Sequence, residues 1–301
     1  GFIGMTERGN AGGEPVLITG FSQFLKKFGG YLSSFTHGEY RYLPISVEQF
    51  FTNGGTRCYI SRVIPEDAKK ALKETKAVIL EASNEGKWGN RIRVTFKDIK
   101  KKKMQVMEKK QGEDGVYIVK STEGFKEGDI VFGKGRYNKI VSIFDNVVTM
   151  TEPFAEDIVD NSTVPQTLLY LSETDITVEI DGEREEYRGV TFNVNSENYI
   201  GERLKKSSIV NIVSVNRPEK PMSITEAIFG EEIMEGTITL EGGSDGSIEK
   251  VTAETFIGED KGPGKRTGIQ SFMENDTVSI MAVPGIAMPE EMVALEYGMK
   301  F

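Results

Sequence analysis

The sequence predicts an α/β protein: a mixed, largely parallel sheet flanked by helices, interrupted by an inserted all-β domain that forms a small barrel or sandwich. Two patterns lead to this prediction. Strand and helix signals alternate with short connections at both ends of the chain, which is typical of βαβ units. In the middle the helical period fades, and short β runs separated by turn residues replace it. We therefore expect a discontinuous α/β core domain, residues 1–76 and 193–301, and an inserted β-rich domain, residues 77–192.

The elements near the N-terminus alternate between helix and strand. Ser22 opens a helix that two consecutive glycines end. A second helix follows Pro44, with Ser46 as its N-cap and Gln49 completing a capping box. The next strand is expected over residues 57–63.

Later segments give equally local signals. Asp181 and Gly182 form a turn that predicts a β-hairpin. Ser196 caps a short helix, and residues 267–274 predict another helix. Residues 278–283 are apolar apart from one serine, which is typical of a strand that is buried on both faces.

Composition excludes several classes of function. The net charge of −9 argues against nucleic acid as the main partner, because binding to phosphates needs a basic field. No window approaches the roughly 18–20 apolar residues of a membrane span. One cysteine, Cys58, and one histidine, His37, leave no internal disulfide and no cysteine-based metal site. We expect no catalytic, cofactor-binding or metal-binding residues, no cofactor and no membrane insertion, and we interpret Cys58 as a small core residue.

The Gly-Gly-Ser-Asp-Gly stretch at residues 242–246 fits the Gly-x-Ser-x-Gly nucleophile elbow of serine hydrolases. That chemistry requires a histidine to take the proton of the serine, and the single histidine, His37, precedes Ser244. The hydrolase order of serine, acid and histidine is therefore impossible, although an order that begins with histidine stays open. The alternative is a glycine-rich loop that closes a strand.

Three other features have a functional and a structural interpretation. Residues 262–265 look like a phosphate loop, but Arg266 stands where a P-loop needs Ser or Thr, so we interpret them as an irregular loop. The lysine run at residues 100–103 could contact nucleic acid or an acidic protein, and we favour a solvated edge hairpin. Trp88 could be a ligand platform in a carbohydrate- or receptor-binding module, and its structural interpretation is packing at a domain junction.

Five segments without catalytic character follow one another in a recognisable order. They are residues 1–9 with 14–30, which begin Gly-Phe-Ile-Gly; residues 47–60; residues 86–90, Gly-Lys-Trp-Gly-Asn; residues 240–246, with a Gly-Gly-x-Asp-Gly loop; and residues 266–285, which end in Pro-Gly. In this order they resemble the conserved domain of contractile tail sheath proteins, which form the outer sheath of myophages, R-type bacteriocins and related contractile injection systems. No single segment is diagnostic, whereas the order is.

The resemblance implies a structural subunit and not an enzyme. In the family, six copies form each ring, rings stack helically around an inner tube, and contraction drives the tube through a target envelope. The implied partners are further copies of the chain, the inner tail tube protein, and the baseplate and tail terminator proteins. The implied location is the virion tail sheath, assembled in the cytoplasm of the bacterial host. The insertion matches loosely and carries the lysine run, so we expect it on the outer surface.

The resemblance also implies a truncated fragment. The family carries an N-terminal arm before the Gly-Phe-x-Gly strand and a C-terminal domain after the Pro-Gly strand, and these extensions add strands to neighbouring subunits. We expect this chain, without them, to be a monomer. Two alternatives from other classes stay open: a serine hydrolase that uses Ser244 and His37, and a carbohydrate- or receptor-binding module.

Overall fold

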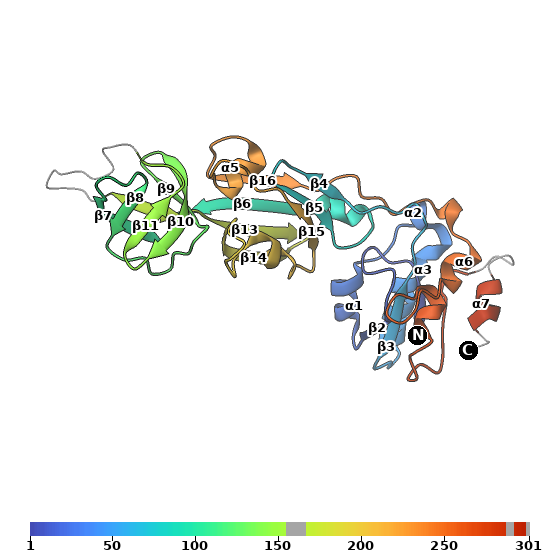
Figure 1. Cartoon of the computed structure of the whole chain (residues 1–301). Coiled ribbons are helices and arrows are strands. Elements are labelled where there is room, and N and C mark those ends of the chain that lie inside the picture. Colours follow the sequence, from blue (N-terminus) through green and yellow to red (C-terminus); the bar gives the residue numbers. More distant parts are fainter. Residues whose placement is uncertain (155–166, 287–291, 299–301) are drawn as a thin grey trace. The chain divides into compact units, whose positions relative to one another are not determined.

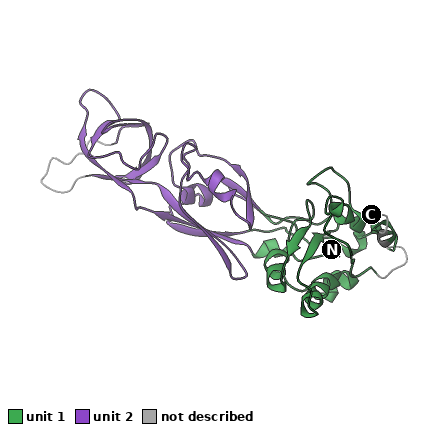
Figure 2. Cartoon of the chain, turned by 90° about the horizontal axis from the view of Figure 1, so that it is seen from below, with its two compact units in different colours: residues 1–72, 82–91, 240–301 green, residues 73–81, 92–239 purple. Residues whose placement is uncertain are grey.

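The computed structural model describes residues 1–154, 167–286 and 292–298, and the chain folds into two compact units. Unit 1 comprises residues 1–72, 82–91 and 240–301, and unit 2 comprises residues 73–81 and 92–239 (Figure 2). The chain therefore passes four times between the two units.

Unit 1 is built around a three-stranded sheet of order β1-β3-β2, in which β1 is parallel and β2 antiparallel to β3. Figure 1 labels β2 and β3 of this sheet. Apolar clusters cover both faces of this sheet, because successive side chains of a strand point to opposite faces. On β3, Ile60 packs with residues of helices α1 (Phe21–Phe28) and α3 (Tyr42–Thr52). Tyr59 packs with the apolar cluster on the other face of the sheet. The elements of unit 1 are β1 (Phe2–Gly4), β2 (Val16–Ile18), α1 (Phe21–Phe28), α2 (Ser34–His37), η1 (Gly38–Arg41), α3 (Tyr42–Thr52), β3 (Cys58–Arg62), η2 (Lys87–Arg91), η4 (Ile248–Lys250), α6 (Ala253–Ile257), η5 (Gly268–Phe272) and α7 (Val293–Gly298).

The prediction of a largely parallel sheet flanked by helices is wrong. The pairings between described strands are mostly antiparallel, and they include a closed barrel. A βαβ unit would bring β3 back parallel to β2. Instead three helices and a 3₁₀ turn lie between these two strands, and this longer path returns the chain in the opposite direction.

Several local predictions for unit 1 are confirmed and others are corrected. The strand predicted over residues 57–63 is β3, and Cys58 is buried within it. Ser46 is not an N-cap, because α3 already begins at Tyr42 and takes Pro44 into its first turn, where a missing N–H is tolerated. Gln49 therefore completes no capping box.

The C-terminal part of unit 1 departs further from its prediction. Residues 278–283 form no strand: Ala282 makes an isolated parallel bridge to Phe2, and Ile280 is 80% exposed. Within the helix predicted over residues 267–274 the chain forms the 3₁₀ helix η5. The apolar run therefore lies beside β1 as an irregular segment and is not buried on both faces.

Unit 2 contains a four-stranded antiparallel sheet of order β14-β13-β6-β16. Asp98, which is buried on β6, accepts hydrogen bonds from Thr174 Oγ1 on β13 at 2.8 Å and from Thr225 Oγ1 on α5 at 2.5 Å, so it ties the helix to the sheet. A smaller sheet has the order β15-β5-β4. These elements are β4 (Leu72–Glu74), β5 (Val78–Ala82), β6 (Arg93–Ile99), β13 (Glu173–Ile180), β14 (Glu183–Val190), α4 (Ile200–Leu204), β15 (Val210–Val215), α5 (Ile224–Phe229) and β16 (Glu235–Thr239).

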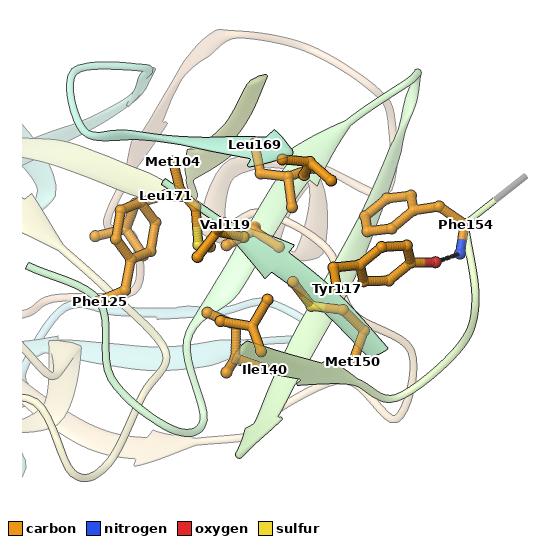
Figure 3. Close-up of a cluster of buried hydrophobic side chains, with 12 residues drawn as sticks. Met104, Tyr117, Val119, Phe125, Ile140, Met150, Phe154, Leu169 and Leu171 are labelled. Atoms are coloured by element: carbon orange, nitrogen blue, oxygen red, sulfur yellow. Dashed lines mark hydrogen bonds between the residues drawn. The ribbon is translucent and has the colours of Figure 1, made fainter. Parts of the chain in front are cut away.

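The rest of unit 2 is a closed six-stranded barrel of order β10-β11-β8-β7-β12-β9. The barrel is one of the two alternatives that the strand spacing left open. Apolar side chains fill its interior, as expected for a small barrel, and the phenol oxygen of Tyr117 accepts a 2.6 Å hydrogen bond from the Phe154 N–H (Figure 3). Its strands are β7 (Lys103–Lys109), β8 (Val116–Val119), β9 (Ile130–Gly133), β10 (Arg136–Phe144), β11 (Val147–Met150) and β12 (Leu168–Leu171).

Removal of the barrel is expected to leave the remainder of unit 2 folded. The Leu171 N–H donates to the Lys102 oxygen at 2.9 Å, and Ile99 already pairs with Glu173. Deletion of residues 103–171 therefore leaves a short hairpin loop between β6 and β13. Circular dichroism and urea unfolding should report a cooperative, β-rich protein.

The matched control is deletion of residues 97–192, which also removes β13, β14 and the end of β6, so that only β16 and the first residues of β6 remain of the four-stranded sheet. We expect this variant to lose cooperative unfolding of unit 2. Equal behaviour of the two deletions would contradict the division into barrel and sheet.

Candidate functional site

Arg62 lies at the end of β3, in the middle of the unit 1 sheet, and is 3% exposed. Among the described residues, its guanidinium donates to main-chain carbonyl oxygens, which come from two separate loops. The contacts are Nη1 to Gly9 at 2.6 Å, Nη2 to Glu85 at 2.9 Å and to Glu7 at 3.5 Å, and Nε to Thr6 at 3.3 Å. We call Arg62 and the segments around it, residues 6–9, 84–90 and 243–246, the Arg62 hub.

Arg62 is a buried cation that makes no direct salt bridge to the residues described in the structure. Burial lowers the pKa of the Arg62 guanidinium to about 10, while the negative charges of Glu85, Asp245 and Glu7 oppose that shift. The side chain is therefore still protonated at neutral pH. A buried charge is tolerated only when its hydrogen bonds are satisfied, and the planar guanidinium supplies several donors for the carbonyls around it.

The glycine-rich segment 242–246 closes the hub from the other side. The Asn90 side chain pairs with both main-chain groups of Gly243: its Nδ2 donates to the Gly243 oxygen at 2.9 Å, and its Oδ1 accepts from the Gly243 N–H at 2.7 Å. Asp245 Oδ1 accepts from the Lys87 N–H at 2.8 Å. Ser244 and Lys69 exchange two main-chain hydrogen bonds of 2.9 Å. This segment therefore joins separate parts of unit 1 through hydrogen bonds of both main-chain and side-chain groups.

The geometry removes the basis of the hydrolase alternative. Ser244 Oγ accepts a hydrogen bond from the Gly246 N–H at 3.1 Å. His37 ends α2, is buried, and places Nδ1 2.8 Å from Thr36 Oγ1. Within the part of the chain that the structure describes, no hydrogen bond joins the Ser244 and His37 side chains. The imidazole that a serine hydrolase needs is therefore not hydrogen-bonded to Ser244 in the described structure.

Trp88 is not a ligand platform. It is 2% exposed, and its indole Nε1 donates to the Glu85 oxygen at 3.2 Å. The ring therefore packs inside the Arg62 hub, next to the point where the chain leaves for unit 2 at residue 92. The binding-module alternative loses its best support.

The lysine run does not lie on an edge hairpin, because β6 and β7 each pair with strands on both sides. Lys101 Nζ lies 3.6 Å from Asp175 and Lys102 Nζ lies 3.3 Å from Glu173, a carboxylate whose side chain is only 5% exposed. Lys100 Nζ lies 4.1 Å from the centre of the Phe132 ring. Lys101 and Lys102 therefore neutralise acids at the start of β13, a role that sequence reasoning missed because the partners lie about 70 residues further along the chain.

The Gly-Pro-Gly loop offers no phosphate cradle. Arg266, which stands at the position of the P-loop hydroxyl, is held by Asp260 at 2.8 Å and Glu274 at 2.9 Å. The loop leads into the 3₁₀ helix η5 and not into an α-helix. Next to it, a surface hollow of about 620 Å³ contains both acids and lysines, and its lysines are paired: Lys250 with Glu66 at 3.1 Å and Lys261 with Glu259 at 2.7 Å.

The described residues contain no group of three or more His, Cys, Asp or Glu side chains that could hold a metal ion. Among the same residues, every helix is too short or too polar to cross a membrane.

The chain is similar in structure to sheath tail proteins. A sheath tail protein from Listeria innocua matches at a TM-score of 0.45 with 13% sequence identity, over 98% of this chain and 43% of the other. A sheath tail protein from Desulfitobacterium hafniense matches at a TM-score of 0.41 with 12% identity, over 99% of this chain and 45% of the other. This chain thus spans less than half the length of either. No family model and no curated protein sequence matches it.

Proposed function

We propose that this chain is part of the structural subunit of a contractile, phage-tail-like sheath, which polymerises helically around an inner tube and contracts to drive the tube through a target envelope. One observation carries the proposal: all five segments that resemble the sheath family lie in unit 1, although they are spread over residues 1–285. Three of them meet at the Arg62 hub, where their polar groups hydrogen-bond to one another. Such a stiff, internally bonded body suits a subunit that moves as a unit.

An open sheet edge in unit 1 supports assembly by strand addition. β2 is hydrogen-bonded to β3 on one side, and no strand in the described ranges pairs with its other side. Leu17, in the middle of β2, is 41% exposed. An edge of this kind accepts a further strand from another chain. The arms of neighbouring subunits would supply that strand in rings of six copies, and the tail tube, baseplate and terminator proteins would be the other partners.

Electron microscopy tests the proposal. The complete product of the gene that encodes this chain is expressed alone and compared with the 301-residue chain. We expect long hollow tubes from the complete product and dispersed particles from the chain, which should sediment as a monomer. Dispersed particles from both would contradict the sheath proposal, and ordered tubes from the chain would contradict the role assigned to the arms.

The barrel deletion extends this test. If the β-rich part of unit 2 lies on the outer surface of the sheath, the complete product without residues 103–171 should still form tubes. Loss of tubes from a variant that still unfolds cooperatively would contradict the outward placement.

A further inference from the structure

The turn that follows α3 contains Asn53 and Gly54, which form the single Asn-Gly pair of the sequence. Both residues are exposed. Gly54 has φ +93°, a conformation that favours glycine, and nothing lies within 4 Å of the Cβ position that it lacks. The turn therefore favours a glycine directly after Asn53, and it leaves the space around that glycine open.

An asparagine followed by glycine is chemically labile, because the next main-chain nitrogen can attack the side-chain carbonyl and no side chain obstructs it. A bond forms between Gly54 N and Asn53 Cγ, and the bond between Cγ and Nδ2 breaks. Nδ2 leaves as ammonia and takes the proton of the Gly54 N–H. Water then opens the resulting succinimide ring at either carbonyl. The product is aspartate, or isoaspartate, in which the main chain runs through Cβ and Cγ.

The native turn orients the two reacting atoms away from each other. Asn53 has ψ 20°, which rotates the Gly54 nitrogen away from the Asn53 Cβ. Asn53 Nδ2 donates to the Gln49 oxygen at 2.8 Å, and the Gly54 N–H donates to the Phe51 oxygen at 3.2 Å. Both bonds have to break before the nitrogen reaches Cγ. They belong to the exposed end of a helix, which opens at a smaller free-energy cost than its interior.

We propose that Asn53 is a modification site of this protein: it loses its side-chain amide without an enzyme, with water as the co-reactant, and opening of the last turn of α3 sets the rate. The site is independent of the proposed sheath function.

The modification changes the connection between α3 and β3. Either product places a negative charge beside the C-terminal carbonyls of α3, where the helix dipole disfavours it, and removes the bond that Asn53 donates to Gln49. Isoaspartate also lengthens the main chain ahead of β3, the central strand of the unit 1 sheet.

Peptide mapping of the 301-residue chain tests the site. The chain is kept at mildly alkaline pH in water enriched in heavy oxygen and is then digested at acidic pH in ordinary water, so the label marks carboxyl groups formed during the incubation. We expect labelled aspartate and isoaspartate at residue 53 first. Asn195, which is exposed but followed by Ser196, is the internal reference and should react more slowly. Earlier labelling of Asn195, or none at residue 53, would overturn the proposal.

The same incubation in guanidinium chloride tests the role of the turn. We expect the folded chain to react about tenfold more slowly than the unfolded chain, the factor that corresponds to an opening free energy of about 1.4 kcal/mol. Equal rates in the two states would show that the turn does not set the rate, which would overturn that part of the proposal.

Asn53→Gln is the matched variant. Glutamine keeps an exposed amide, but its extra methylene means that attack by the next nitrogen would have to close a larger ring. Label at residue 53 should therefore be lost, while Asn195 reacts as in the wild type. Labelling of the variant at the wild-type rate would exclude the Gly54 nitrogen as the attacking group. If the variant does not fold, the comparison is made in guanidinium chloride, where folding has no influence.

Discussion

Replacement of Arg62 by methionine is expected to lower the free energy of unfolding of unit 1 by about 3–5 kcal/mol. Methionine fills similar space but has no hydrogen-bond donor. The buried carbonyl oxygens of Thr6, Gly9 and Glu85 would therefore lose the hydrogen bonds that Arg62 donates to them. The negative charges near the hub also lose the cation between them. Urea unfolding followed by tryptophan fluorescence measures the effect specifically, because Trp88 is the single tryptophan and is buried in unit 1.

The matched control is Arg57→Met, since Arg57 is exposed and immediately precedes the same strand. Its effect should stay within about 0.5 kcal/mol. Arg62→Lys should fall between the two variants, because an ammonium keeps the charge but cannot reach the same set of carbonyls. Equal midpoints for Arg62→Met and Arg57→Met would show that the hub does not hold unit 1 together.

Replacement of Gly86 by alanine is expected to destabilise unit 1 by about 3 kcal/mol, through two separate causes. Gly86 has φ +136°, which side-chain-bearing residues rarely adopt. In addition, its Cβ would lie 2.6 Å from Trp88 Cδ1 and 2.9 Å from the Glu7 oxygen, so neighbouring groups of the hub would have to move. The same fluorescence measurement reports the change.

Gly242→Ala separates the two causes. Gly242 has φ +80°, but nothing lies within 4 Å of its Cβ position, so only the conformational cost of about 1 kcal/mol remains. If the two alanine variants unfold at the same urea concentration, the close approach at Gly86 contributes nothing to stability.

Local patterns in the sequence predicted several elements correctly, because these elements depend on residues close to one another. The strand around Cys58 follows from its own β-forming residues. The turn at Asp181 and Gly182 follows from two residues that tolerate a positive φ, and both residues have a positive φ in the structure. The direction of β3 relative to β2 depends instead on the path of the chain between them, which periodicity does not encode.

The Arg62 hub could be predicted only in part. Its glycines and Asn90 stood out as motifs, but Arg62 itself looked like an ordinary strand residue, and its acceptors are main-chain carbonyls that any residue type would supply. The apolar run at residues 278–283 failed for a related reason. Hydropathy indicated burial on both faces, whereas Ile280 is exposed and only Ala282 bridges to β1.

Closure of the barrel in unit 2 has a consequence for solubility at high local concentration. Each of its six strands already has a hydrogen-bonded neighbour on either side. A passing polypeptide therefore finds no unsatisfied row of amides and carbonyls on the six described strands with which to begin cross-chain β association. As long as the barrel stays closed, changes in its side chains leave the edges of these six strands paired.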